Sequence, residues 1–102
     1  MSERIISISL EVKIYPSVDR NNMCLSIPKA ALTTLDIKQQ KPSDKPDYYE
    51  VYMVAKDFFG NVLLNGRVEL VSGTELNKYY FNCSNQHKLY PNQTIYIDIA
   101  RP

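Results

Sequence analysis

The sequence predicts a mainly β fold: a small antiparallel barrel or sandwich of six to seven strands with one short helix at about residues 28–36. Apolar and polar residues alternate with a period of two over most of the chain, helical spacing occurs once and briefly, and alternating segments lie at both ends. Without long helices to cover a parallel sheet, the strands are expected to be antiparallel and to close on themselves. We expect residues 1–102 to form a single β-rich domain, because a chain of this length supports one core.

The first predicted strand covers residues 6–15. Five aliphatic residues share one of its faces: Ile6, Ile8, Leu10, Val12 and Ile14. Ten extended residues span roughly 33 Å, which exceeds the diameter of a compact domain of this size. The strand is therefore expected to bend, to carry a bulge or to reach into a partner before Pro16 ends it.

The segment LSIPKAALTTLDIK, residues 25–38, predicts a strand that turns through a corner into a short helix. Pro28 suits the first helical position, and Ala31, Leu32 and Leu35 form an apolar stripe at helical spacing. Residues 38–47 contain two prolines and mixed charges, which predicts a solvated loop.

Alternation returns after this loop, and a turn is expected at residues 57–61. The dipeptide Asn65-Gly66, set between apolar runs, favours a tight hairpin turn, and the alternative is a glycine bulge within one continuous strand. In the last strand Ile95, Ile97 and Ile99 are expected to face the core. Strands at the two termini can pair with each other, which would remove two sheet edges.

Residue types for catalysis are sparse, so we expect a protein that is not an enzyme, with no catalytic residues, no metal site and no cofactor. The single histidine, His87, lies in a polar segment, and Asp44 and Asp47 lie in a proline-rich loop where nothing separates their carboxyl pKa values. Three scattered glycines form no phosphate-binding loop.

A cytoplasmic protein without a membrane partner is expected, because the longest apolar runs are short and the N-terminal residues do not resemble a signal peptide. Cys24 and Cys83 are expected to be buried apolar residues in a reducing compartment; the alternative is a disulfide in an oxidising one.

Charge gives a weak indication of the binding partner. The formal net charge is +1, but residues 1–41 hold six basic and four acidic residues. A dimer would double any positive surface formed by this excess.

The run Leu25-Ser26-Ile27-Pro28-Lys29, continued to Leu35 and Ile37-Lys38, resembles the strand-corner-helix signature of the AbrB and MazE group of swapped-hairpin DNA-binding domains. The resemblance spans residues 10–71, and related pseudobarrel DNA-binding domains share the pattern. It implies an intertwined homodimer that acts as a transcription regulator or antitoxin, with DNA phosphates contacted by Lys13, Arg20, Lys29 and Lys38. This chain departs from the family at Met23-Cys24, where Gly-Arg is usual, and at residues 39–41, where the family favours Gly-Asp.

Two other binding functions remain open from the residues alone. The chain has eight tyrosines, and outward positions for Tyr48, Tyr52 and Tyr96 would supply an aromatic contact surface for single-stranded DNA, unless these are ordinary half-buried strand residues. The same rings and the balanced charge would also suit a small protein-interaction module or inhibitor encoded by a phage or mobile element.

Overall fold

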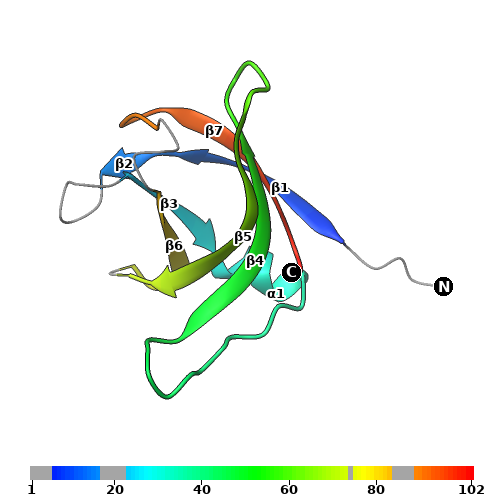
Figure 1. The fold of residues 1–102 in the computed structure, drawn as a ribbon, viewed down its shortest axis with the longest axis vertical. Helices are drawn as coiled ribbons and strands as arrows, with labels where there is room; N and C mark the ends of the chain where they lie inside the picture. The colour runs from blue at the N-terminus through cyan, green and yellow to red at the C-terminus, as the bar shows by residue number, and fades with distance from the viewer. Residues whose placement is uncertain (1–5, 17–22, 74, 84–88) are drawn as a thin grey trace.

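The computed structural model describes residues 6–16, 23–73, 75–83 and 89–102. Seven antiparallel strands form one sheet that curls into a half-barrel, and one short helix follows the third strand (Figure 1). The mainly β, antiparallel fold class is confirmed. No helix within the described ranges is long and apolar enough to cross a membrane.

The order of the strands in the sheet is β1-β7-β4-β5-β6-β3-β2. Their bounds, with that of the helix, are β1 Ser7–Lys13, β2 Tyr15–Pro16, β3 Met23–Pro28, α1 Lys29–Thr34, β4 Tyr48–Lys56, β5 Val62–Ser72, β6 Lys78–Cys83 and β7 Thr94–Ala100. The strands at the two ends of this order, β1 and β2, are consecutive in the chain and separated only by Ile14. The sheet therefore curls until its ends meet within one bent segment.

The predicted bend of the first strand is confirmed at Ile14. Its side chain is fully buried, its N–H donates to the carbonyl of Gln93 at 2.8 Å, and its carbonyl accepts from the N–H of Asn92 at 2.7 Å. Before the bend β1 pairs with β7, and after it β2 pairs with β3. The predicted pairing of the terminal strands is therefore also confirmed.

The helix is shorter than predicted, and Pro28 lies outside it. Pro28 has φ −69° and ψ 143°, an extended conformation that ends β3 and places the residue at the N-cap of α1. At the other end, Asp36 has φ 57°, and its N–H and that of Ile37 donate to Thr33 and Leu32 at 3.0 and 3.1 Å. This arrangement is a Schellman motif, which ends the helix soon after Thr34.

The predicted hairpin turn at Asn65-Gly66 is wrong. β5 continues through both residues, and the chain turns earlier, at residues 57–61, where Gly60 has φ 85°. The alternative of one continuous strand is correct, but the irregularity is not at Gly66. Ala55 lies opposite Leu64 and Lys56 opposite Val62, so the extra residue on β5 is the one between them.

The core lies on the concave side of the curled sheet. It is formed by the inward-facing residues of the strands and by the α1 segment, and it includes Leu25, Ile27, Leu32, Leu35, Val51, Met53, Leu70, Ile95, Ile97 and Ile99. The inward face predicted for β7 is confirmed, and on β4 the residues that alternate with Tyr48 and Tyr52 are buried in the same way. The outward residues of the same strands are left for contact with other molecules.

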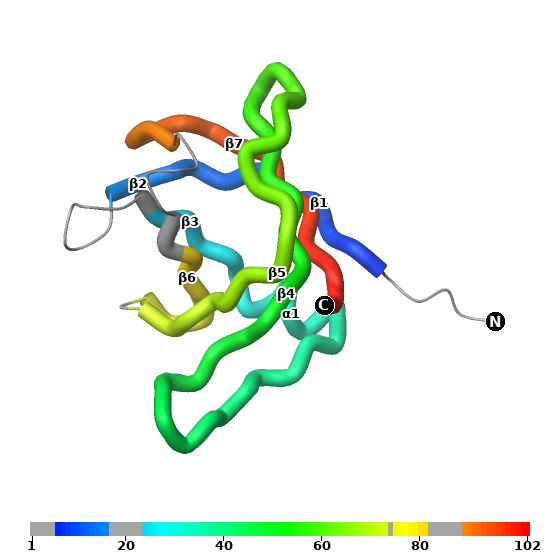
Figure 2. Tube along the Cα trace, in the orientation of Figure 1, coloured from blue at the N-terminus to red at the C-terminus, as the bar shows by residue number. Residues whose placement is uncertain are grey.

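The sheet is open on one side. β5 pairs with β6 only where Val71 lies opposite Tyr80 and Ser72 opposite Tyr79, and the two strands then diverge (Figure 2). Beside this short ladder, the ring centres of Tyr49 on β4 and Tyr79 on β6 lie 4.7 Å apart. A side-chain contact thus adds to the two paired positions of the junction.

Candidate functional site

The outer face of β1, β7 and β4 collects several residues that the sequence analysis selected. The register places Tyr96 of β7 between Glu11 of β1 and Lys56 of β4. Lys13 follows Glu11 by two residues on the same face, opposite Thr94. The structure therefore brings Lys13 and Tyr96 close together and adds Lys56, which the sequence analysis did not select.

Two tyrosines on this outer face keep their rings partly open to solvent. Tyr52 and Tyr96 are each 40 % exposed, and the Tyr52 hydroxyl donates a hydrogen bond to Oδ1 of Asn65 on β5. Tyr48, also predicted as a contact residue, is half-buried, and Nζ of Lys45 lies 4.4 Å from the centre of its ring. Tyr52 and Tyr96 therefore offer more free ring surface than Tyr48 does.

The lysines of this face differ from cations elsewhere in the described chain. Lys13 and Lys56 are exposed and make no ion pair with a described residue. Three other cations do form ion pairs: Lys45 with Glu69 at 3.2 Å, Lys78 with Glu75 at 2.7 Å and Arg67 with Glu50 at 3.8 Å. Lys13 and Lys56 are therefore free to contact an anionic group of a ligand.

Acidic residues balance these lysines. Glu11 and Asp98 lie on the same outer face, and the Ser9 hydroxyl donates a hydrogen bond to Oδ1 of Asp98. Because the local charges nearly cancel, binding here would depend on ring contacts and hydrogen bonds more than on a strong positive field.

The other predicted phosphate contacts do not join this face. Lys29 begins α1, at the far end of β3: Tyr15 lies opposite Cys24, and Lys29 follows Cys24 by five residues, about 17 Å of extended chain. Lys13 and Lys29 are thus placed toward opposite ends of β3. Arg20 lies outside the described residues.

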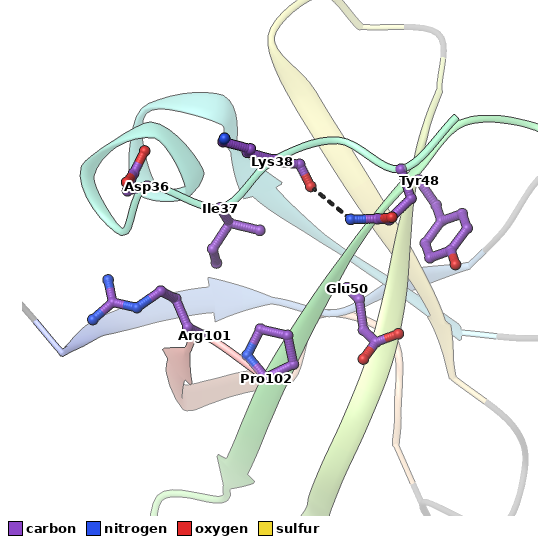
Figure 3. Close-up of a pocket in the computed structure, with 8 residues that line it drawn as sticks. Asp36, Ile37, Lys38, Tyr48, Glu50, Arg101 and Pro102 are labelled. Carbon is purple, nitrogen blue, oxygen red and sulfur yellow. Dashed lines mark hydrogen bonds between the residues drawn. The ribbon is translucent and has the colours of Figure 1, made fainter. Parts of the chain in front are cut away.

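Lys38 lies instead in a shallow pocket of about 430 Å³ between the end of α1, the start of β4 and the last two residues (Figure 3). Nη1 of Arg101 donates to the carbonyl of Leu35 at 2.7 Å, which fixes one wall. Charges of both signs line the pocket, and the ring of Tyr48 points away from Arg101. The lining residues are Asp36, Ile37, Lys38, Gln40, Tyr48, Glu50, Arg101 and Pro102. This mixed lining selects no single class of ligand.

An exposed aromatic pair at the β4–β5 turn was missed by the sequence analysis. Phe58 and Phe59 are 76 % and 84 % exposed, and their rings meet edge to face. The Asp57 carboxylate accepts from the N–H groups of Phe59 and Asn61, both at 2.9 Å, and hydrogen bonding from Asn61 holds the pKa of Asp57 below its usual range. The order Asp-Phe-Phe-Gly-Asn was a usable signal, because Asp caps such turns and leaves the two rings at the tip.

The described residues show one buried thiol, one half-buried tyrosine hydroxyl and no metal-binding cluster. No group of three or more His, Cys, Asp and Glu side chains in the described ranges could hold a metal ion. Cys24 is a buried free thiol, as predicted, and burial raises its pKa. Burial also holds the pKa of Tyr15 far above its usual range, with the side chain of Cys24 as the next cause. His87 lies outside the described residues.

Comparison of the chain with protein-family models, with curated proteins and with solved structures finds no match.

Proposed function

We propose that this protein is a non-enzymatic module that binds single-stranded nucleic acid across the outer face of β1, β7 and β4. The observation that carries the proposal is the placement of two partly open rings, Tyr52 and Tyr96, on the same face as two unpaired lysines, Lys13 and Lys56. Bases stack on aromatic rings without regard to sequence, and lysines beside the rings contact the phosphates that link those bases.

A single strand suits this face better than a duplex does. In a duplex the base faces are stacked on one another and cannot reach the rings of Tyr52 and Tyr96. The duplex contacts that the family resemblance implies use Lys13 and Lys29, and these residues lie toward opposite ends of β3. Duplex binding by a regulator or antitoxin remains a prediction from that resemblance.

The proposal is tested by fluorescence anisotropy with a labelled oligo-dT, and with a duplex of equal length, over a range of salt concentrations. Two phosphate contacts on a single strand predict a slope of log K against log salt of about −1.4. Tyr96→Ala and Tyr52→Ala should each weaken binding by about 1–3 kcal/mol, the loss of one stacked base. Lys13→Ala should lower the magnitude of the slope by about 0.7.

Matched controls separate these effects from general damage. Tyr48→Ala removes a strand tyrosine whose ring is already covered by Lys45, and Lys78→Ala removes a lysine that is paired with Glu75, so neither should change oligo-dT binding. Tighter binding to the duplex than to oligo-dT would refute the proposal. So would an affinity for oligo-dT that is unchanged by Tyr52→Ala, by Tyr96→Ala and by salt.

A second candidate is a protein ligand on the same outer face. Glu11 and Asp98 offset the two lysines there, and a near-neutral surface with aromatic residues is typical of protein interfaces. This candidate is favoured if oligo-dT does not bind at low salt and if Tyr96→Ala abolishes the binding of a purified protein partner.

A further inference from the structure

The strand β5 leaves a long stretch of backbone without a neighbour. It pairs with β4 along its length, but β6 meets it only at Val71 and Ser72. Along Val62–Leu70, which we call the open edge, no described strand lies on the side away from β4. Backbone groups on such an edge are a template for another strand, and nine residues exceed the usual strand length of about 5–6.

The two ends of the open edge carry different exposed apolar features. At the Val62 end lies the turn with Phe58 and Phe59, which are 76 % and 84 % exposed. Beyond the Leu70 end lies the β5–β6 turn, where Leu76 is 88 % exposed beside a hollow of about 240 Å³. An apolar projection and a hollow lined by Leu76, Tyr79 and several polar residues therefore lie at opposite ends of the same edge.

We propose that a second copy of this chain pairs antiparallel with β5 along the open edge, with the two-fold axis at Gly66. Gly66 is the midpoint of Val62–Leu70, so this register uses the whole open stretch and stops where β6 begins to pair. A two-fold contact uses the same surface on both copies. Antiparallel pairing then brings the Phe58 and Phe59 turn of each copy toward the hollow beside Leu76 of the other.

The side chains fit this register. Gly66 carries no side chain, and nothing lies within 4 Å of the place where a Cβ would be, so two backbones can approach at the axis. On the inner side Leu64 comes opposite Val68 of the second copy, and on the outer side Asn65 comes opposite Arg67 of the second copy, so like charges do not face each other directly. The two Arg67 side chains flank the axis, and Glu50 lies 3.8 Å from the guanidinium within each copy.

A shift of register makes the pairing worse. Centring the axis on Arg67 would place two guanidinium groups directly opposite each other. Centring it on Val68 would extend the second strand past Val71, where β6 already pairs. The open edge meets the proposed nucleic-acid site only where the Tyr52 hydroxyl donates to Asn65, because Lys13 and Tyr96 lie on β1 and β7.

Sedimentation equilibrium over a wide range of protein concentration tests the pairing. We expect the mass to rise from 11.8 kDa toward twice that value as concentration increases. Phe58→Ala combined with Phe59→Ala, and separately Leu76→Ala, should each raise the dimer Kd by about tenfold or more, as truncation of buried apolar anchors does. Ile6→Ala, which truncates another exposed apolar residue away from the edge, should leave Kd unchanged.

A cysteine trap tests the register. In a Cys83→Ser background, mild oxidation should link two copies of Gly66→Cys, whereas Glu69→Cys, three residues along the same strand, should stay unlinked. Circular dichroism of each variant confirms that it is folded. The proposal would be overturned by a monomer at every concentration, or by equal linking at positions 66 and 69. It would also be overturned if neither the Phe58 and Phe59 double variant nor Leu76→Ala changed the dimer Kd.

Discussion

The two sides of β5 are held in different ways. On one side, β4 pairs with β5 from Tyr48 opposite Val71 to Lys56 opposite Val62. On the other side, β6 pairs with β5 at only two positions, Val71 and Ser72, and the rings of Tyr49 on β4 and Tyr79 on β6 meet beside this junction. One strand thus joins a long ladder, which has a single bulge, to a short junction.

This difference divides the sheet into a long ladder and a second part that is joined to it at few positions. β1, β7, β4 and β5 form a long ladder with one bulge between β4 and β5, and this ladder carries the outer face with Tyr52 and Tyr96. β6, β3 and β2 reach that ladder through the short junction and through the bend at Ile14. The proposed nucleic-acid face lies on the long ladder, and the proposed pairing edge lies where β5 has no second described neighbour. Substitutions on each side should therefore differ in size.

The largest effect is expected in the long ladder. Ile97 is buried between Leu10 of β1 and Ala55 of β4. Ile97→Ala should lower the free energy of unfolding by about 2–5 kcal/mol, because it removes buried methyl groups and leaves a cavity. Urea denaturation measures the loss, and Ile6→Ala, on an exposed side chain, should change it by about 0.5 kcal/mol or less. Equal losses for the two variants would contradict this account of the ladder.

A smaller effect is expected at the β5–β6 junction. A Cβ on Gly73 would lie 2.3 Å from Cε2 of Tyr80, so Gly73→Ala must displace the Tyr80 ring. Tyr80 lies opposite Val71 in the short β5–β6 ladder. We expect a loss of about 1–3 kcal/mol, typical of overpacking. Gly66→Ala is the matched control, because nothing lies within 4 Å of its Cβ, and it should be neutral or slightly stabilising in urea denaturation. A greater loss for Gly66→Ala would show that the open edge is more crowded than the junction.

The sequence was sufficient to predict which face of a strand is buried. Alternation assigns Val51 and Met53 of β4 and Ile97 of β7 to the core, because only one side of the sheet is covered and a shift by one residue would expose them all. The hairpin at Asn65-Gly66 was wrong because these residues are also tolerated inside a strand. The chain had already turned at Asp57, where the carboxylate satisfies the turn.

The candidate site was predictable only in part. Alternation puts Lys13 and Tyr96 on outward positions, but their proximity depends on the register of β1 against β7, which pairs residues more than eighty positions apart. Local sequence does not specify such a register. The separation of Lys29 from Lys13, and the short junction of β5 with β6, follow from the curvature of the whole sheet. Neither has a local sequence signal.

A smaller effect again is expected for the ring contact between Tyr49 on β4 and Tyr79 on β6, which lies beside the β5–β6 junction. The rings of Tyr49 and Tyr79 lie 4.7 Å apart at an angle of 72°. Tyr79→Leu keeps an apolar side chain but removes the ring pair, which is worth about 0.5–1.5 kcal/mol beyond buried area. Urea denaturation should show a loss of about 1 kcal/mol, and amide exchange should speed up in β6 more than in β4. Uniform acceleration in both strands would contradict a separate opening at this side of β5.

The smallest effect is expected from pH, through tyrosines on β2 and β4. Burial raises the pKa of Tyr15 on β2, and burial together with the Tyr79 hydroxyl raises the pKa of Tyr49. In the unfolded state these hydroxyl groups lose their protons at the ordinary tyrosine pKa of 10.0, whereas in the folded state they lose them at a higher pH. The free energy of unfolding should therefore be constant below about pH 9 and should fall above about pH 10. Tyr15→Phe removes one of the groups, so the fall in urea midpoint between about pH 9 and pH 11 should be smaller than in the parent. Tyr90→Phe, which changes an exposed ring, is the control and should leave the fall in urea midpoint unchanged. If both variants reduced the fall equally, the environment of Tyr15 would not be the cause of the fall.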